Sequence, residues 1–200
     1  MYIPKHFANN DPEDVLAFIN KYSFGTIITA QDNMPFGTHV PFVAEMRDGE
    51  IVLSSHLAKA NPHAQQLFDN EAMVIFTEPH AYISPQHYEK EQSVPTWNYI
   101  AVHAYGKATP VDDTEQFLGL MEKMIAQYEP AYFNQWAKLP MDFKTKMLNA
   151  IVGFEIRVTT LEAKNKLSQN RSEKERQNII AAFENSVDVN EATIAAYMKG

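Results

Sequence analysis

The feature that most constrains the fold is a series of short β-type segments, joined by tight turns, in the first half of the chain. One segment runs from Phe24 to Ala30, a second from Phe36 to Met46, and Asp48-Gly49 leads into a third that ends at Ser54. Strands joined by short hairpins pair antiparallel, and the chain lacks the regular alternation of strand and helix that builds a doubly wound sheet. We therefore predict a mainly β protein with flanking helices (α+β).

Later segments add strands to this sheet. The stretch from Ala72 to Glu78 is apolar throughout and continues across Pro79 to residues 82–84. The stretch from Trp97 to Thr109 is apolar on both of its alternating faces, which indicates burial on both sides. Residues 152–158 alternate cleanly and predict a late strand. About six strands in the first half, one of them buried on both faces, favour closure into a small barrel.

Helices are predicted from capping residues followed by apolar positions at helical spacing. The expected ranges are 11–22, 61–69, 112–128, 142–150, 172–185 and 190–200. Ser172 with Glu175 forms the capping-box pattern. We expect one domain over residues 1–200 with a helical C-terminal extension at about 172–200.

Composition limits the classes of function. The chain has 200 residues, which suits one substantial domain, and it has no cysteine, which excludes disulfides and thiolate metal sites. The formal charge is −8, so the chain as a whole repels nucleic acid. No apolar segment is long enough for a signal peptide or a membrane span, and we expect a cytoplasmic protein.

A candidate phosphate site follows the third strand. Ser54 and Ser55 offer hydroxyl donors and backbone N–H groups where the strand is expected to end, and Lys59 offers a cation. Asn61-Pro62 then resembles a helix start. The alternative is an ordinary polar turn between a strand and a helix.

Other residues are candidates for the same ligand. His39 would lie beside the Ser54 strand if the Asp48-Gly49 hairpin forms, and a histidine next to a phosphate helps to hold it. Trp97 provides a flat apolar wall for a planar ring, and Asn98 provides donors and acceptors for the ring's edge. The alternative for Trp97 is a place in the hydrophobic core.

Several familiar sites are missing from the sequence. The seven histidines lack the spacings of common zinc sites, so we expect no metal site, although a haem held by one histidine needs no motif. There is no nucleophile elbow, no Gly-x-Gly-x-x-Gly fingerprint and no phosphate-binding P-loop. No residue stands out as a catalytic acid or base, so whether the chain is an enzyme stays open.

A basic segment lies near the C-terminus. Residues 157–176 contain six Lys or Arg residues against three Glu residues, in an otherwise acidic chain. Such a run is usually a solvated face, but this one could bind an anion, close a dimer or touch DNA. A helix-turn-helix is disfavoured because residues 190–200 contain one Lys and no Arg.

Four motifs together resemble the PaiB family across nearly the whole chain. They are Met-Tyr-Ile-Pro-Lys-His-Phe, Ser-Ser-His-Leu-Ala-Lys-Ala-Asn-Pro-His, Val-Pro-Thr-Trp-Asn-Tyr-x-Ala-Val-His-Ala-x-Gly and Lys-Leu-Ser-Gln-Asn-Arg. Members of this family are described as negative regulators of protease synthesis and sporulation, within the FMN-binding split-barrel group. The resemblance implies a six- to seven-stranded antiparallel split β-barrel and a homodimer with flavin sites at the subunit interface.

The resemblance also implies roles for the candidate residues. Ser54, Ser55 and Lys59 match the pattern that holds the FMN phosphate, His39 stands where relatives often have an arginine, and Trp97 with Asn98 would lie near the isoalloxazine ring. The function implied is an FMN-binding transcriptional negative regulator. A flavin-dependent oxidoreductase and a haem-binding or haem-degrading protein remain alternatives. DNA contact would use the segment 157–176.

Overall fold

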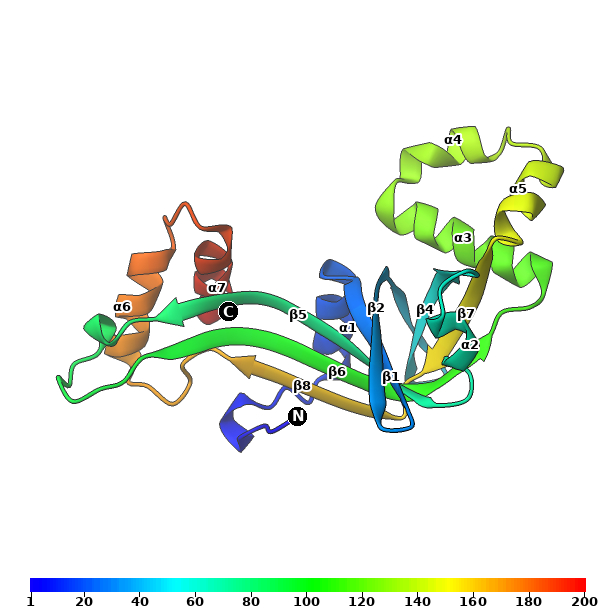
Figure 1. Ribbon diagram of the computed structural model, residues 1–200. Helices are drawn as coiled ribbons and strands as arrows, with labels where there is room; N and C mark the ends of the chain where they lie inside the picture. The colour runs from blue at the N-terminus through cyan, green and yellow to red at the C-terminus, as the bar shows by residue number, and fades with distance from the viewer. The chain divides into compact units, whose positions relative to one another are not determined.

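The computed structural model describes all 200 residues, from Met1 to Gly200 (Figure 1). The chain forms two compact units. The terminal unit comprises Met1–Asp11, Thr77–His103 and Glu162–Gly200, and the central unit comprises Pro12–Phe76 and Ala104–Leu161. The helices at the C-terminal end, expected as an extension, share a unit with the first eleven residues and with the middle of the chain.

The strands form one eight-stranded sheet in the order β2-β1-β5-β6-β7-β4-β3, with β8 paired to β6. The strands are β1 (Phe24–Gln31), β2 (Met34–Pro41), β3 (Val43–Arg47), β4 (Glu50–Ala58), β5 (Glu71–Ile83), β6 (Thr96–Pro110), β7 (Ile151–Arg157) and β8 (Thr160–Lys166). The predicted fold class is confirmed, because the strands pair antiparallel and helices flank the sheet. β8 is a strand that the sequence analysis did not predict, because residues 160–166 are mostly polar.

Two tight hairpins of the central unit form where the sequence predicts turns. Asp32 and Asn33 both have positive φ, 51° and 63°, between β1 and β2. Asp48 and Gly49 have φ values of 54° and 83° between β3 and β4. Positive φ at both central residues gives the twist that a two-residue hairpin needs, and Asn, Asp and Gly tolerate it best.

The predicted strand from Phe36 to Met46 is in fact two strands, interrupted at Phe42. β3 pairs with β4 as expected, but β2 pairs with β1, with His39 opposite Thr26. The expected pairing of His39 beside the Ser54 strand is therefore wrong. Pro41 has no N–H to donate, and the chain changes partner there.

β4 continues four residues beyond its predicted end at Ser54. It pairs with β7 along its length, with Ser54 opposite Glu155 and Ser55 opposite Phe154. The strand partner lies about a hundred residues away in sequence, so nothing local indicates that the strand continues. The expectation of free backbone N–H groups at Ser54 and Ser55 is wrong for this reason.

The helices follow the predicted pattern with two differences. They are α1 (Pro12–Lys21), α2 (His63–Gln66), α3 (Thr114–Tyr128), α4 (Phe133–Trp136), α5 (Met141–Leu148), α6 (Glu173–Phe183) and α7 (Val189–Lys199), with short 3-10 turns at Lys5–Phe7, Pro85–His87 and Pro130–Tyr132. α2 is shorter than expected, and α4 has no counterpart in the prediction. The capping box of Ser172 and Glu175 is confirmed. None of the helices combines the length and the apolar character that crossing a membrane requires.

Each unit has its own packed interior. In the central unit the buried rings of Phe76 and Phe154 both meet Phe42 edge-on, with ring centroids 5.5 and 6.2 Å apart. In the terminal unit α6 and α7 lie side by side (Figure 1), with Ile179 and Ile194 fully buried. Aromatic contacts of this geometry add to the stabilisation from apolar burial.

Candidate functional site

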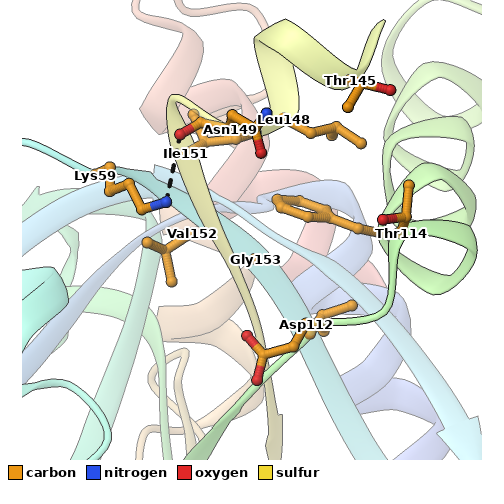
Figure 2. A pocket seen from close by; sticks show the side chains of 11 residues that line it. Lys59, Asp112, Thr114, Thr145, Leu148, Asn149, Ile151, Val152 and Gly153 are labelled. Atoms are coloured by element: carbon orange, nitrogen blue, oxygen red, sulfur yellow. Dashed lines mark hydrogen bonds between the residues drawn. The ribbon is translucent and has the colours of Figure 1, made fainter. Parts of the chain in front are cut away.

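A pocket of about 180 Å³ lies beside Lys59 in the central unit (Figure 2). Lys59 directly follows β4, and its backbone N–H donates to the carbonyl of Ala150 at 2.9 Å. The Lys59 ammonium donates to the carbonyl oxygen of Asn149 at 3.4 Å, as the dashed line in Figure 2 shows. The lining residues come from α3, α5 and β7 and from the segments that follow β4, β6 and α5 (Lys59, Val111, Asp112, Thr114, Phe117, Thr145, Leu148, Asn149, Ile151, Val152 and Gly153).

The apolar side of this pocket is fixed by close packing. Phe117 is buried in a cluster with Leu120 and Leu148, at the start of α3 and the end of α5. A Cβ atom on Gly153 would lie only 2.7 Å from the Phe117 ring, so glycine is what allows β7 to approach α3 this closely. The pocket therefore has one rigid apolar side and a polar rim.

The chemistry of the rim suits an anion only in part. A phosphate there would meet the Lys59 ammonium and the hydroxyls of Thr114 and Thr145. It would also meet the carboxylate of Asp112, which repels it. Lys59 fits a phosphate contact, and it is the one member of the predicted Ser54, Ser55 and Lys59 set that lines this pocket.

Ser54 and Ser55 are buried and bonded within the protein. Ser54 is 1% exposed and its hydroxyl donates to Glu155 Oε1 at 3.2 Å, while Ser55 is fully buried and donates to the carbonyl of Pro41 at 2.6 Å. Consecutive strand residues point to opposite faces of a sheet, so these two hydroxyls do not converge. Neither fits a phosphate in this arrangement, and their role in holding FMN stays a prediction.

Glu155 also receives a bidentate ion pair. Arg47 Nη1 and Nη2 donate to its two oxygens at 3.0 and 2.6 Å. Burial raises the pKa of Glu155, but the hydrogen bonds and charge of Arg47 and the Ser54 hydroxyl outweigh it and hold the pKa below the usual value. The same pair raises the pKa of Arg47. Ser54 thus belongs to a structural ion-pair network between β3, β4 and β7.

The buried histidine of the central unit is His63, not His39. His39 is exposed on β2, where its ring stacks near Phe24 at a centroid distance of 6.5 Å. His63 is fully buried, and its Nε2 and Nδ1 atoms each lie 2.9 Å from a threonine hydroxyl, those of Thr29 and Thr38. Burial lowers the pKa of His63, so the ring is neutral at pH 7.

The sequence carries a weak signal for this arrangement. Asn61 accepts a hydrogen bond from the His63 N–H at 2.9 Å, and this local turn is what the Asn-Pro-His run indicates. The two threonines lie on β1 and β2, so their convergence on His63 depends on the strand pairing. His63 therefore ties α2 to the hairpin of β1 and β2.

Trp97 and Asn98 lie in the terminal unit, and only Trp97 is exposed enough to contact a ligand. Trp97 is 51% exposed, and its ring lies 5.8 Å from Tyr82 and 6.1 Å from His80, so it forms part of an exposed aromatic surface. Asn98 is fully buried, accepts from the Ser168 hydroxyl at 3.1 Å and donates toward Met198 Sδ at 3.5 Å. Trp97 can contact a planar ligand directly, whereas the amide of Asn98 already has partners within the protein.

Comparison of the fold with solved structures gives the class of protein. The flavocytochrome Anf3 of Azotobacter vinelandii has a TM-score of 0.66 at 14% identity, with 82% of this chain and 72% of that chain covered. A Mycobacterium smegmatis structure described as an FAD and heme binding protein has a TM-score of 0.63 at 14% identity, with 79% and 72% covered. The chain shares its split-barrel fold with these two proteins.

Sequence comparison gives the family. Residues 1–160 match the family model described as "Putative FMN-binding domain". The chain is 37% identical over 206 residues to the Bacillus subtilis (strain 168) protein named "Protease synthase and sporulation protein PAI 2", covering 100% of this chain and 97% of the relative. The chain belongs to this FMN-binding domain family, and the predicted resemblance to PaiB is confirmed.

Proposed function

We propose that this protein binds FMN and acts, as a cytoplasmic homodimer, as a negative regulator of protease synthesis and sporulation. The observation that carries the proposal is the full-length similarity to the Bacillus subtilis PAI 2 protein, together with the FMN-binding family match. The absence of cysteine suits a reducing compartment. Homodimer formation, location and regulation come from the family resemblance.

In this proposal Lys59 provides the cation for the FMN phosphate. Its ammonium has one carbonyl partner, at the long distance of 3.4 Å, so it retains donors for a ligand. Ser54 and Ser55 would join the phosphate only by giving up their bonds to Glu155 and Pro41. When bound, FMN supplies the redox and light-absorbing chemistry, and the chain's residues hold and orient it.

Trp97 is the proposed neighbour of the isoalloxazine ring. Half of its surface is exposed, and Tyr82 and His80 extend the aromatic area beside it. Planar rings stack favourably on such surfaces. His39, exposed on β2, is proposed as a second polar neighbour of the flavin. The proposed contribution of Asn98 requires its amide to turn from Met198 or Ser168 toward the ring.

The experiment that tests FMN binding is a fluorescence titration of the full chain with FMN. Lys59→Ala should weaken binding by about 1 to 3 kcal/mol, because a charge-assisted phosphate contact is lost. Lys107→Ala is the matched control, since Lys107 is exposed on β6 in the same unit and does not line the pocket. An unchanged dissociation constant in Lys59→Ala would remove Lys59 from the site.

Regulation by direct DNA contact would use the segment 157–176. A chain of charge −8 binds DNA only where local cations outweigh the acidic remainder, and dimer symmetry doubles such a patch. A gel-shift assay with the purified protein and DNA from upstream of protease and sporulation genes tests this contact. The absence of any salt-sensitive complex would leave regulation through another protein or a small molecule.

A second candidate is a haem-binding protein or a flavin-dependent oxidoreductase. It is favoured by the structural similarity to proteins whose names include both flavin and haem. The absorption spectrum of the purified protein separates these cases, because a haem gives a Soret band and a flavin gives two bands in the near-ultraviolet and blue. FMN-dependent consumption of NAD(P)H would identify an oxidoreductase.

A further inference from the structure

The structure divides the six cations of the basic segment 157–176 into two groups. Three have partners that neutralise or fix them: Arg157 donates to Glu50 at 2.7 Å, Lys174 to Glu89 at 2.8 Å, and Arg176 to the carbonyl of Met198 at 2.9 Å. The other three are Lys164, Lys166 and Arg171, here called the cationic cluster. All three belong to the terminal unit, and all lie beyond the residues matched by the family model.

Lys164 is deeply buried among neutral groups. It is 7% exposed, and its ammonium donates to the carbonyl of Tyr2 at 3.2 Å. The same ammonium lies 5.1 Å from the ring centre of Tyr99 and 5.9 Å from that of Tyr2. Carbonyls and ring faces stabilise a cation, but they carry no net charge, so its full positive charge remains in the unit.

Lys166 is half-buried next to it on β8. Its ammonium donates to the Thr96 hydroxyl at 2.5 Å and to the carbonyl of Trp97, which are again neutral partners. Burial, followed by the charges of Lys164 and Arg171, lowers the pKa of Lys166. Lys164 and Lys166 are two residues apart on β8 and lie on the same face of the strand, and Arg171 follows in the next turn.

Arg171 presents the free edge of its guanidinium. The flat group stacks over the Tyr88 ring, with Cζ 3.7 Å from the ring centre. Stacking occupies the face of a guanidinium and leaves its N–H edge free to bind an oxyanion through two parallel hydrogen bonds. Arg171 is only partly exposed, so its orientation is restricted by packing as well as by the ring.

The turn that carries Arg171 is held rigidly by its own polar side chains. Ser168 has a φ of 60°, is 3% exposed and donates to Asn98 Oδ1. The Gln169 side chain accepts from the Leu167 N–H at 2.8 Å, and the Arg171 N–H donates to the Ser168 carbonyl at 3.0 Å. Ser168 and Gln169 of the sequence motif therefore hold the turn, and the cations on either side are the groups left for a ligand.

The carboxylates nearby already have partners. Glu162, two residues before Lys164, accepts from the Met1 amino group. Glu89 pairs with Lys174 and Ser172, and Glu175 accepts from the backbone of Ser172 and Glu89. None of the three cations in the cationic cluster forms an ion pair with these carboxylates, and Glu175, bonded to backbone N–H groups, keeps its own negative charge nearby.

We infer that Lys166 and Arg171, with Lys164 behind them, form a binding site for a small oxyanion of the phosphate class. Like charges that are partly buried are costly, and a bound oxyanion both neutralises them and fills the free guanidinium edge. Three cations suit one phosphate group. Three cations are too few to hold nucleic acid on an acidic chain. Each neutralised phosphate contributes only about 0.9 to the slope of the logarithm of the binding constant against the logarithm of salt concentration.

The proposed oxyanion site shares no side chain with the Lys59 pocket, although Lys166 donates to the carbonyl of Trp97, the proposed neighbour of the flavin ring. The test uses inorganic phosphate as the probe and isothermal titration calorimetry on the full chain, with chloride at the same ionic strength as the reference. The variants are Arg171→Gln and Lys166→Gln. Lys174→Gln is the matched control, since it removes the same charge from the same segment where Glu89 already pairs it.

Arg171→Gln is expected to weaken phosphate binding at this site about tenfold or more, while Lys174→Gln retains wild-type affinity. Lys166→Gln loses the hydrogen bond to Thr96 and could fail to fold. Arg171 is partly exposed, so Arg171→Gln tests the site in either case. Equal phosphate affinity in wild type and Arg171→Gln would overturn the proposal. So would loss of binding in Lys59→Ala alone, or a wild type that binds duplex DNA through Arg171 but not phosphate.

Discussion

The His63 network permits a quantitative prediction about stability. His63→Ala removes two side-chain hydrogen bonds at a fully buried position and leaves the hydroxyl of Thr29, which is 1% exposed, without its partner. A buried hydrogen bond contributes about 0.5 to 1.5 kcal/mol net, and an unsatisfied buried hydroxyl costs about 1 to 3 kcal/mol. We expect His63→Ala to lower the free energy of unfolding by about 2 to 4 kcal/mol.

The pH dependence of this loss follows from the protonation of the ring. Because burial lowers the pKa of His63 below the usual histidine value of 6.5, the unfolded chain binds the proton more readily than the folded protein. The contribution of His63 is therefore complete above pH 6.5 and is lost as the pH falls through the lower folded pKa. The difference between wild type and variant should therefore narrow as the pH falls below 6.5.

Urea denaturation of the full chain at several pH values measures both effects. His39→Ala is the matched control, because His39 is exposed on β2 in the same unit, and its loss should change stability by less than about 0.5 kcal/mol. His56, His87 and His103 also have lowered pKa values, caused first by burial, so the comparison with the variant isolates His63. A difference that stays constant or widens toward low pH would refute the reasoning.

Two further predictions concern the central unit. Gly153→Ala places a methyl group 2.7 Å from the buried Phe117 ring, and this overpacking should cost about 1 to 3 kcal/mol in the same urea assay, whereas Gly119→Ala, with open space around it, should not destabilise. Glu155→Gln breaks the ion pair with Arg47 and should cost about 1 to 3 kcal/mol at pH 7. Because the pKa of Glu155 is lowered in the folded protein, its contribution to stability is present above the usual glutamate value of 4.5 and is lost as the pH falls below it, so wild type and variant should converge in acid. Full stability of Gly153→Ala, or a Glu155→Gln difference that persists unchanged in acid, would contradict these assignments.

The sequence by itself determined the elements that depend on local signals. Asp48-Gly49 specifies a tight hairpin, because few residues tolerate positive φ, and Ser172 with Glu175 specifies a helix start through reciprocal bonds three residues apart. The motifs around Lys59 and Trp97, taken in order, were enough to indicate the flavin-binding family.

The tertiary structure decided which of the candidate polar groups are available. Ser54 meets an acceptor 101 residues away and Ser55 one 14 residues away, so no local pattern shows that both hydroxyls are already bonded. β8, which reads as a polar run, becomes a strand because β6 is beside it. The charge of the segment 157–176 was visible in the sequence, but long-range pairing determined that Lys166 and Arg171 remain without a carboxylate.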